Sequence, residues 1–276
     1  MYPAPFEYVR AESVAHAIAL LAEHGDEAKL LAGGHSLLPL MKLRLAQPSV
    51  LVDIARIAGL TGVTDGGDHL AIGALTTHAQ LERDPLLERH NGLIAAAAHQ
   101  VGDPQVRHRG TVGGSCAHGD PASDLPSVMV ALDATFEIQG PDGARSVAAR
   151  DFFRGFWETA LAPGEILTTI RVPKLAAGAS FTYVKLNRRA QDWAIVGVAA
   201  LADRVLGKRI AFTNLGPTPV RGAAVETALA GGATVAQASE HATDDAEPPE
   251  DAHATREYRA HLARVLSRRA LESIAA

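Results

Sequence analysis

Two short glycine-rich segments constrain this chain more than any other feature of its sequence. Residues 32–36 read Ala-Gly-Gly-His-Ser, and residues 111–115 read Thr-Val-Gly-Gly-Ser. Glycine permits positive φ angles and lets a backbone come close to a ligand, and successive exposed N–H groups form a concave site for anions. Two such loops, each strengthened by a serine hydroxyl and a following helix, can clasp the two phosphates of a dinucleotide from opposite sides.

Each glycine pair taken alone is also typical of a plain turn. Neither matches the G-x-G-x-x-G fingerprint of doubly wound nucleotide folds or the phosphate loop that ends in Gly-Lys-Ser/Thr. The presence of two similar loops favours the ligand hypothesis, and so does the long polar stretch of residues 102–126 around the second one. We expect this stretch to be a loop, and loops of that length are usually functional or disordered.

Hydrophobic periodicity and turn signals predict a chain of mixed helices and strands. We expect Ser13 and Ser36 to cap the first two helices. The arginines of the last helix are expected on a solvated face, and the acidic residues 231–253 are expected to form a mobile loop. Strands are expected at residues 29–32, 50–54, 69–72, 134–139, 166–172, 180–186, 194–203 and 209–215, and helices at residues 13–23, 37–45, 78–99, 125–132, 220–229 and 257–274.

The composition changes at residues 174–179, a small and loose segment that we interpret as a linker. This predicts an N-terminal domain of residues 1–176, with subdomains of about 1–56 and 57–176, and a C-terminal domain of residues 177–276. The overall class is α+β, because the last domain shows three antiparallel strands with helices.

Charge and cysteine content exclude several functions. The net charge is −5 and aromatic residues make up 5% of the chain, so neither the basic stripe nor the stacking surface of a nucleic-acid binder is expected. Cys116 is the single cysteine, which excludes an internal disulfide and a cysteine-held iron–sulfur cluster and suits the cytoplasm. We expect Cys116 to be a small buried residue, and we expect no metal site and no membrane span, with docking on the inner membrane face through a partner left open.

Residues 32–36, 102–115 and 118–126 resemble the flavin signatures of the medium subunit of aerobic carbon monoxide dehydrogenase and its relatives, which include xanthine dehydrogenase. The resemblance covers nearly the whole chain. It implies a two-subdomain FAD-binding domain of the vanillyl-alcohol-oxidase type, followed by a small domain with a three-stranded antiparallel sheet and helices. FAD would lie extended between the subdomains and the C-terminal part.

The resemblance also assigns roles to residues. Residues 32–36 and 111–115 would hold the FAD pyrophosphate, Asp124 would accept from sugar or ribityl hydroxyls, and Lys185 would contact the flavin ring. Trp193 stands where the carbon monoxide dehydrogenases commonly carry a tyrosine against the isoalloxazine face. The predicted cofactor-binding residues are Lys29, Ala32, Gly33, Gly34, His35, Ser36, Val101, Thr111, Val112, Gly113, Gly114, Ser115, Asp124, Ile166, Leu167, Lys185, Asp192 and Trp193.

Some of these side chains have a competing structural role. Lys29 and Lys185 could occupy solvated strand positions, and Asp124 could cap the following helix. Ile166 and Leu167 could pack in the core, and Trp193 could be an aromatic plug in the core. The residues concerned are Lys29, Asp124, Ile166, Leu167, Lys185 and Trp193.

The family implies a function in electron transfer. Its large subunit carries the molybdenum cofactor, its small subunit carries 2Fe-2S clusters, and its flavin subunit passes electrons to quinone, NAD or oxygen. The resemblance thus implies an oxidoreductase subunit of a heterotrimer, assembled as a dimer of heterotrimers, with no catalytic acid or base of its own. A stand-alone FAD oxidase or reductase of the same fold and a non-enzymatic nucleotide-binding module remain the alternatives.

Overall fold

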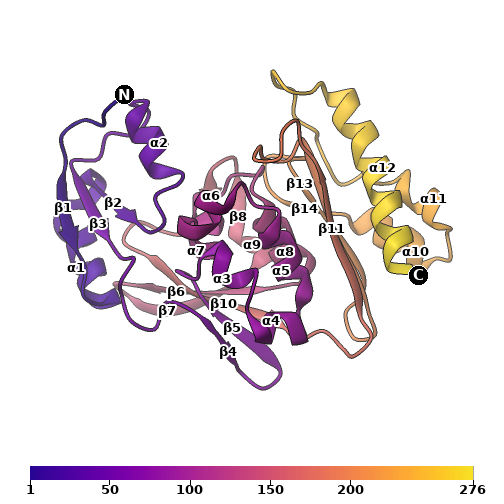
Figure 1. Ribbon diagram of the computed structural model, residues 1–276, viewed down its shortest axis with the longest axis horizontal. Coiled ribbons are helices and arrows are strands. Elements are labelled where there is room, and N and C mark those ends of the chain that lie inside the picture. Colours follow the sequence, from indigo (N-terminus) through magenta and orange to yellow (C-terminus); the bar gives the residue numbers. More distant parts are fainter. Residues whose placement is uncertain (276) are drawn as a thin grey trace.

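The computed structural model describes residues 1–275, in which three main β-sheets follow one another along the longest axis of the molecule (Figure 1). The first sheet is parallel, with the strand order β1-β3-β2, and the other two are antiparallel, with the orders β4-β5-β10-β6-β7 and β11-β12-β13-β14. The expected α+β class is therefore confirmed. The strands of the three sheets are β1 (Glu7–Arg10), β2 (Ala28–Leu31), β3 (Val50–Asp53), β4 (Val63–Asp65), β5 (His69–Gly73), β6 (Thr135–Gly140), β7 (Gly143–Ala148), β10 (Ile166–Pro173), β11 (Ser180–Leu186), β12 (Val196–Asp203), β13 (Gly207–Thr213) and β14 (Val220–Arg221).

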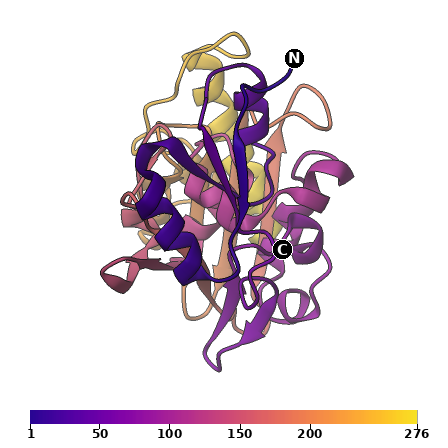
Figure 2. The ribbon, with the colours of Figure 1, turned by 90° about the vertical axis from the view of Figure 1, so that its left-hand side faces the viewer.

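The N-terminal sheet carries two helices, α1 (Val14–His24) and α2 (Leu37–Lys42), with a 3-10 turn, η1 (Gly25–Glu27), after the first. Figure 2 looks onto this part of the molecule. Ser13 caps α1 as expected, because its side chain accepts from the His16 backbone N–H. The same expectation for Ser36 is wrong: its backbone already has helical angles, and its side chain makes no capping bond to α2.

The five-stranded sheet is covered by helices (Figure 1). Six of these helices lie between β5 and β6 in the chain, and a seventh follows β7. A two-stranded hairpin, β8 and β9, completes this region. The elements are α3 (His78–Leu81), α4 (Pro85–His90), α5 (Gly92–His99), α6 (Pro104–Arg109), α7 (Val112–His118), α8 (Asp124–Ala131), α9 (Ala149–Phe152), β8 (Phe153–Gly155) and β9 (Glu158–Thr159).

The expected loop at residues 102–126 is largely helical, which corrects the sequence interpretation. Asp103 caps α6 through the Val106 N–H, and Thr111 caps α7 through the Gly114 N–H. Gly113 and Gly114 lie within α7, and Gly119 ends this helix in a left-handed conformation. The two capping residues were the sequence signal for these helices.

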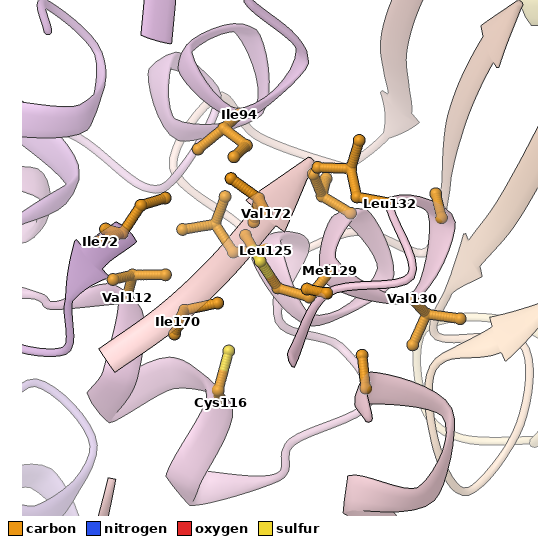
Figure 3. Packing of buried hydrophobic residues seen from close by; sticks show 14 of the residues in the cluster. Ile72, Ile94, Val112, Cys116, Leu125, Met129, Val130, Leu132, Ile170 and Val172 are labelled. Atoms are coloured by element: carbon orange, nitrogen blue, oxygen red, sulfur yellow. The ribbon is translucent and has the colours of Figure 1, made fainter. Parts of the chain in front are cut away.

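The core between the central sheet and its helices is apolar and closed (Figure 3). Val112 and Cys116 on α7 point into it together with Ile170 of β10, and all three side chains are fully buried. Burial raises the pKa of the Cys116 thiol because the thiolate would lose its hydration. Cys116 is thus a small core residue, as expected.

The C-terminal sheet is packed on both faces. Val198 and Ala200 of β12 belong to the core under α12 (Arg256–Ala275), and Ala199 and Leu201 belong to the central core. Because side chains alternate along a strand, one strand joins both cores. Two further helices complete this domain: α11 (Val235–Ser239) lies beside α12, and α10 (Ala223–Ala230) lies beside α11 and β13.

Three expectations for this domain need correction. A short fourth strand, β14, occupies the start of the expected helix at residues 220–229. The expected mobile loop at residues 231–253 contains α11, which Thr234 and Gln237 close with a reciprocal capping box. Arg259 is completely buried and does not lie on a solvated face, since its guanidinium donates to the backbone carbonyls of Ile195 and Asn214.

Among residues 1–275, no helix combines the length and the apolar character that crossing a membrane requires. In the same residues, no three His, Cys, Asp or Glu side chains gather into a group that would hold a metal ion.

Candidate functional site

A cleft of about 520 Å³ lies between elements of the N-terminal sheet, the helices of the central region and the loop that leads into β12, a volume typical of ligand sites. Its walls come from β2 and α2 on one side and from α7 and the start of α8 on the other. The start of β10 and the loop before β12 complete it. The two glycine segments, which are 75 or more residues apart in the chain, therefore line one cavity.

The first glycine segment presents unpaired backbone donors. In the described part of the chain, the N–H groups of residues 33–36 donate to no backbone or side-chain acceptor. Gly34 has a φ of 77°, a left-handed conformation that glycine adopts without strain. Consecutive free N–H groups at a cleft are a binding site for an anionic group such as a phosphate.

The two glycine segments are in direct contact. A Cβ atom at Gly33 would lie 2.2 Å from the Arg109 carbonyl oxygen and 3.0 Å from the Gly110 Cα. No side chain fits in that space, so the contact depends on glycine at position 33.

The second glycine segment contributes in a different way from the first. Gly113 donates its N–H to the Ala74 carbonyl at 2.8 Å, and Gly114 donates to the Thr111 hydroxyl at 3.1 Å. A Cβ at Gly113 would lie 2.5 Å from the Ala74 Cβ. These N–H groups are already used within the protein, so the second segment does not offer them to an anion. This segment offers the Thr111 and Ser115 side chains and a close approach of α7 to the cleft.

His78 supports the second segment from behind and was missed in the sequence. Its Nε2 lies 3.4 Å from the Ser115 Oγ, and its backbone N–H donates to the Gly110 carbonyl. The ring is almost completely buried, and burial lowers the pKa of His78 to about 4. The imidazole is therefore neutral at physiological pH.

Asp124 forms a buried ion pair at the floor of the cleft. Its carboxylate accepts from the Lys185 Nζ at 2.9 Å and from the Tyr183 hydroxyl at 2.6 Å. Burial raises the pKa of Asp124, and the neighbouring Lys185 ammonium acts in the opposite direction. Asp124 does not act as a side-chain cap, because its carboxylate points to β11 and Ser123 is the residue that precedes α8.

Trp193 is 67% exposed and lines the cleft, which excludes the role of a core plug. It also lines a second cavity of about 190 Å³, together with Asp192 and Arg188. Trp193 therefore contributes to both cavities.

The cleft brings together most of the predicted site. Lys29 has an exposed side chain that faces it, whereas Ile166 and Leu167 are buried core residues at its wall. The predicted residues that line the cleft are Lys29, Ala32, Gly33, His35, Ser36, Thr111, Gly113, Gly114, Ser115, Asp124, Ile166, Leu167 and Trp193.

The other predicted residues lie outside this lining. Val112 is buried in the core, and the Val101 carbonyl accepts a hydrogen bond from the Arg107 side chain. Lys185 lies behind Asp124, with a side chain only 3% exposed. The predicted residues that do not line the cleft are Gly34, Val101, Val112, Lys185 and Asp192.

Family models match almost all of this chain. Residues 4–175 match the FAD binding domain in molybdopterin dehydrogenase, and residues 181–274 match the CO dehydrogenase flavoprotein C-terminal domain. The chain therefore belongs to the family of FAD-binding medium subunits of molybdenum hydroxylases of the carbon monoxide dehydrogenase and xanthine dehydrogenase type, and it is an oxidoreductase subunit.

Individual relatives agree with the family. The chain is 43% identical to the carbon monoxide dehydrogenase medium chain of Hydrogenophaga pseudoflava, over 99% of this chain and 98% of the relative. The solved structure of carbon monoxide dehydrogenase from Hydrogenophaga pseudoflava superimposes with a TM-score of 0.96, covering 100% of this chain and 99% of that one. Quinoline 2-oxidoreductase from Pseudomonas putida 86 superimposes with a TM-score of 0.92 at 31% identity, covering 100% of this chain and 99% of that one.

The residues of the cleft fit FAD. The free N–H groups of residues 33–36 suit a pyrophosphate. Asp124 supplies an acceptor for hydroxyl groups.

Proposed function

We propose that this chain is the FAD-carrying electron-transfer subunit of a molybdenum hydroxylase, which receives electrons from iron–sulfur clusters on a small partner subunit and passes them to an external acceptor. A large partner subunit would carry the molybdenum cofactor, and two heterotrimers would form the complete enzyme. The observation that carries this proposal is the cleft in which both glycine segments meet Asp124. The near-complete coverage of carbon monoxide dehydrogenase medium chains supports it.

Within the chain, we propose a boundary near residue 176, with the FAD-binding part before it. Residues 33–36 would donate backbone N–H groups to the pyrophosphate, and Ser115 would add a hydroxyl. Asp124 would accept from hydroxyls of the cofactor, held in place by Lys185. When bound, FAD supplies the redox chemistry, and the protein supplies its position and electrostatic surroundings.

Trp193 would cover the cofactor ring and limit which acceptors reach it. Replacing it by phenylalanine is expected to leave the free energy of unfolding within about 0.5 kcal/mol of the wild type, because the side chain is mostly exposed. The chain has two tryptophans, Trp157 and Trp193. Trp157 stacks on His118, which lines the cleft, so FAD is expected to quench both tryptophans. The quenching should be stronger in Trp157→Phe, which keeps Trp193, than in Trp193→Phe. Equal quenching in both variants would place the ring away from Trp193.

The direct test of the proposed function is native purification. The chains that co-elute would be identified by mass spectrometry, with molybdenum and iron measured on the same fraction and the assembly mass measured by native mass spectrometry. Co-elution with a molybdenum-containing large chain and an iron-containing small chain is the expected result. A flavoprotein that stays alone and free of both metals would favour a stand-alone flavoenzyme. Fractionation of the cells would show whether the complex is cytoplasmic, as we propose, or docked on a membrane.

A further inference from the structure

Behind the cleft, a closed ring of polar contacts at hydrogen-bond distance begins and ends on Asp124. Its carboxylate accepts from the Tyr183 hydroxyl at 2.6 Å, which lies 3.1 Å from the Thr213 Oγ1. The Thr213 hydroxyl lies 2.6 Å from the Ser127 Oγ, and Ser127 donates back to the Asp124 carbonyl at 2.9 Å. Each member of the ring is at most 6% exposed.

The ring crosses from one part of the molecule to the other. Asp124 and Ser127 lie on α8, whereas Tyr183 lies on β11 and Thr213 on β13 of the C-terminal sheet. Residues of the C-terminal sheet therefore reach the floor of a cleft that is built mainly from the N-terminal part.

Glycine at position 197 makes room for this arrangement. A Cβ there would lie 2.6 Å from the Tyr183 hydroxyl oxygen and 3.0 Å from the Thr213 Cβ. Gly197 lies on β12, between the strands that carry Tyr183 and Thr213. The space occupied by the Tyr183 hydroxyl thus exists only because this strand residue has no side chain.

The protons of the ring depend on the charge of Asp124. Each hydroxyl has one proton to donate. With Asp124 ionised, Tyr183 donates to the carboxylate and Ser127 donates to the Asp124 carbonyl, so Thr213 has one proton for its two neighbours. A protonated carboxyl would instead donate to Tyr183, but it would leave the Lys185 ammonium beside a neutral group, so the ion pair favours the ionised form.

We propose that Tyr183 is a positioning residue that holds Asp124 ionised and directed at the cleft, so that this carboxylate can accept hydrogen bonds from the hydroxyl groups of the bound cofactor. This inference rests on the proposed function of the cleft. The carboxylate has room for further donors, since its two oxygens offer about four acceptor positions and the protein uses one on each.

The charged groups around Asp124 set the sign of the expected pH dependence. Lys185 and Tyr183 face it from β11, and His118, Asp120 and Glu165 line the same cleft. Burial raises the pKa of Asp124, and the Tyr183 hydrogen bond acts against that rise. Loss of this bond therefore raises the pKa further, so the carboxylate protonates at a higher pH.

The test measures FAD binding to the full chain by fluorescence titration across a range of pH. The test variant is Tyr183→Phe, and the matched control is Tyr258→Phe, whose side chain lies on α12. We expect about tenfold weaker binding at neutral pH and a loss of affinity on acidification that begins about one pH unit higher than in the wild type. The control should follow the wild type. Gly197→Ala, which displaces the Tyr183 hydroxyl, should show the same shift and serves if Tyr183→Phe does not fold.

The outcomes separate two hypotheses. A wild-type chain that binds no FAD at neutral pH would overturn the proposed function. A wild type that binds FAD, with variants whose affinity has an unchanged pH profile, would overturn the role of Tyr183 alone, because a merely structural defect weakens binding without moving the protonation of Asp124.

Discussion

Substitution of Gly33 by alanine is expected to weaken FAD binding by at least about a hundredfold. The new Cβ would overlap the Arg109 carbonyl oxygen, with only 2.2 Å between the atoms, so the two glycine segments would have to separate. Separation would move the free N–H groups of residues 33–36 away from the second segment, and a misplacement on the scale of an ångström is enough to disable a site. Equilibrium dialysis with FAD measures the loss.

The control for this substitution is Gly231→Ala. A Cβ at Gly231 makes only ordinary contacts, 3.4 Å and 3.5 Å from two helix carbonyls, and its φ is −76°. We expect wild-type affinity for the control, and cooperative thermal unfolding for both variants. Unchanged FAD affinity in Gly33→Ala would show that the contact between the glycine segments is irrelevant to binding.

Replacement of Lys185 by methionine is expected to lower the free energy of unfolding by about 3–5 kcal/mol. The Lys185 and Asp124 side chains are 3% and 5% exposed, so the variant would leave a buried carboxylate without its counter-ion. Urea-induced unfolding at neutral pH measures this loss. The double variant Asp124→Asn/Lys185→Met should recover much of the stability, because it removes the uncompensated charge.

The loss in Lys185→Met should also depend on pH. Without the ammonium, the pKa of Asp124 in the folded state rises further above its ordinary value of 3.8. A carboxyl whose pKa is higher in the folded than in the unfolded state favours folding at low pH and disfavours it as the pH rises through the folded-state pKa. The stability difference from the wild type should therefore shrink on acidification. A pH-independent difference would show that the defect arises from packing and not from charge.

The two glycine segments predicted where the cleft lies, because both line it. They did not predict which backbone N–H groups are free. The sequence predicts two similar loops, but the Ala74 carbonyl uses the Gly113 N–H and the Thr111 hydroxyl uses that of Gly114. The partner Ala74 lies almost forty residues away in the chain. Such a contact depends on the tertiary packing of the residue that follows β5 against α7, which periodicity does not predict.

The buried network around Asp124 was only partly accessible from the sequence. Lys185 was a candidate, and Tyr183, two residues earlier on a predicted strand, shares its face. That spacing could have identified Tyr183. Thr213 and Gly197 could not have been found in this way, because their role comes from the pairing register of three strands.

Short helices and short strands account for the errors in secondary structure, and the missed strands include β1, β4 and β7. Asp103, Thr111 and Thr234 each precede a short helix where the sequence was interpreted as a loop. Arg259 was predicted to be solvated, but its guanidinium is buried. The tertiary structure explains this, because the guanidinium donates to two backbone carbonyls and to the Asp251 carboxylate.

The most direct test of the account is the FAD content of the purified wild-type chain, incubated with excess FAD at neutral pH, freed of unbound flavin and measured by flavin absorbance per mole of chain. The cleft described here predicts about one FAD per chain, with a marked loss in Gly33→Ala and none in Gly231→Ala. A well-folded wild-type chain that retains no flavin, or a Gly33→Ala chain that retains as much as the wild type, would contradict the assignment of this cleft as the cofactor site.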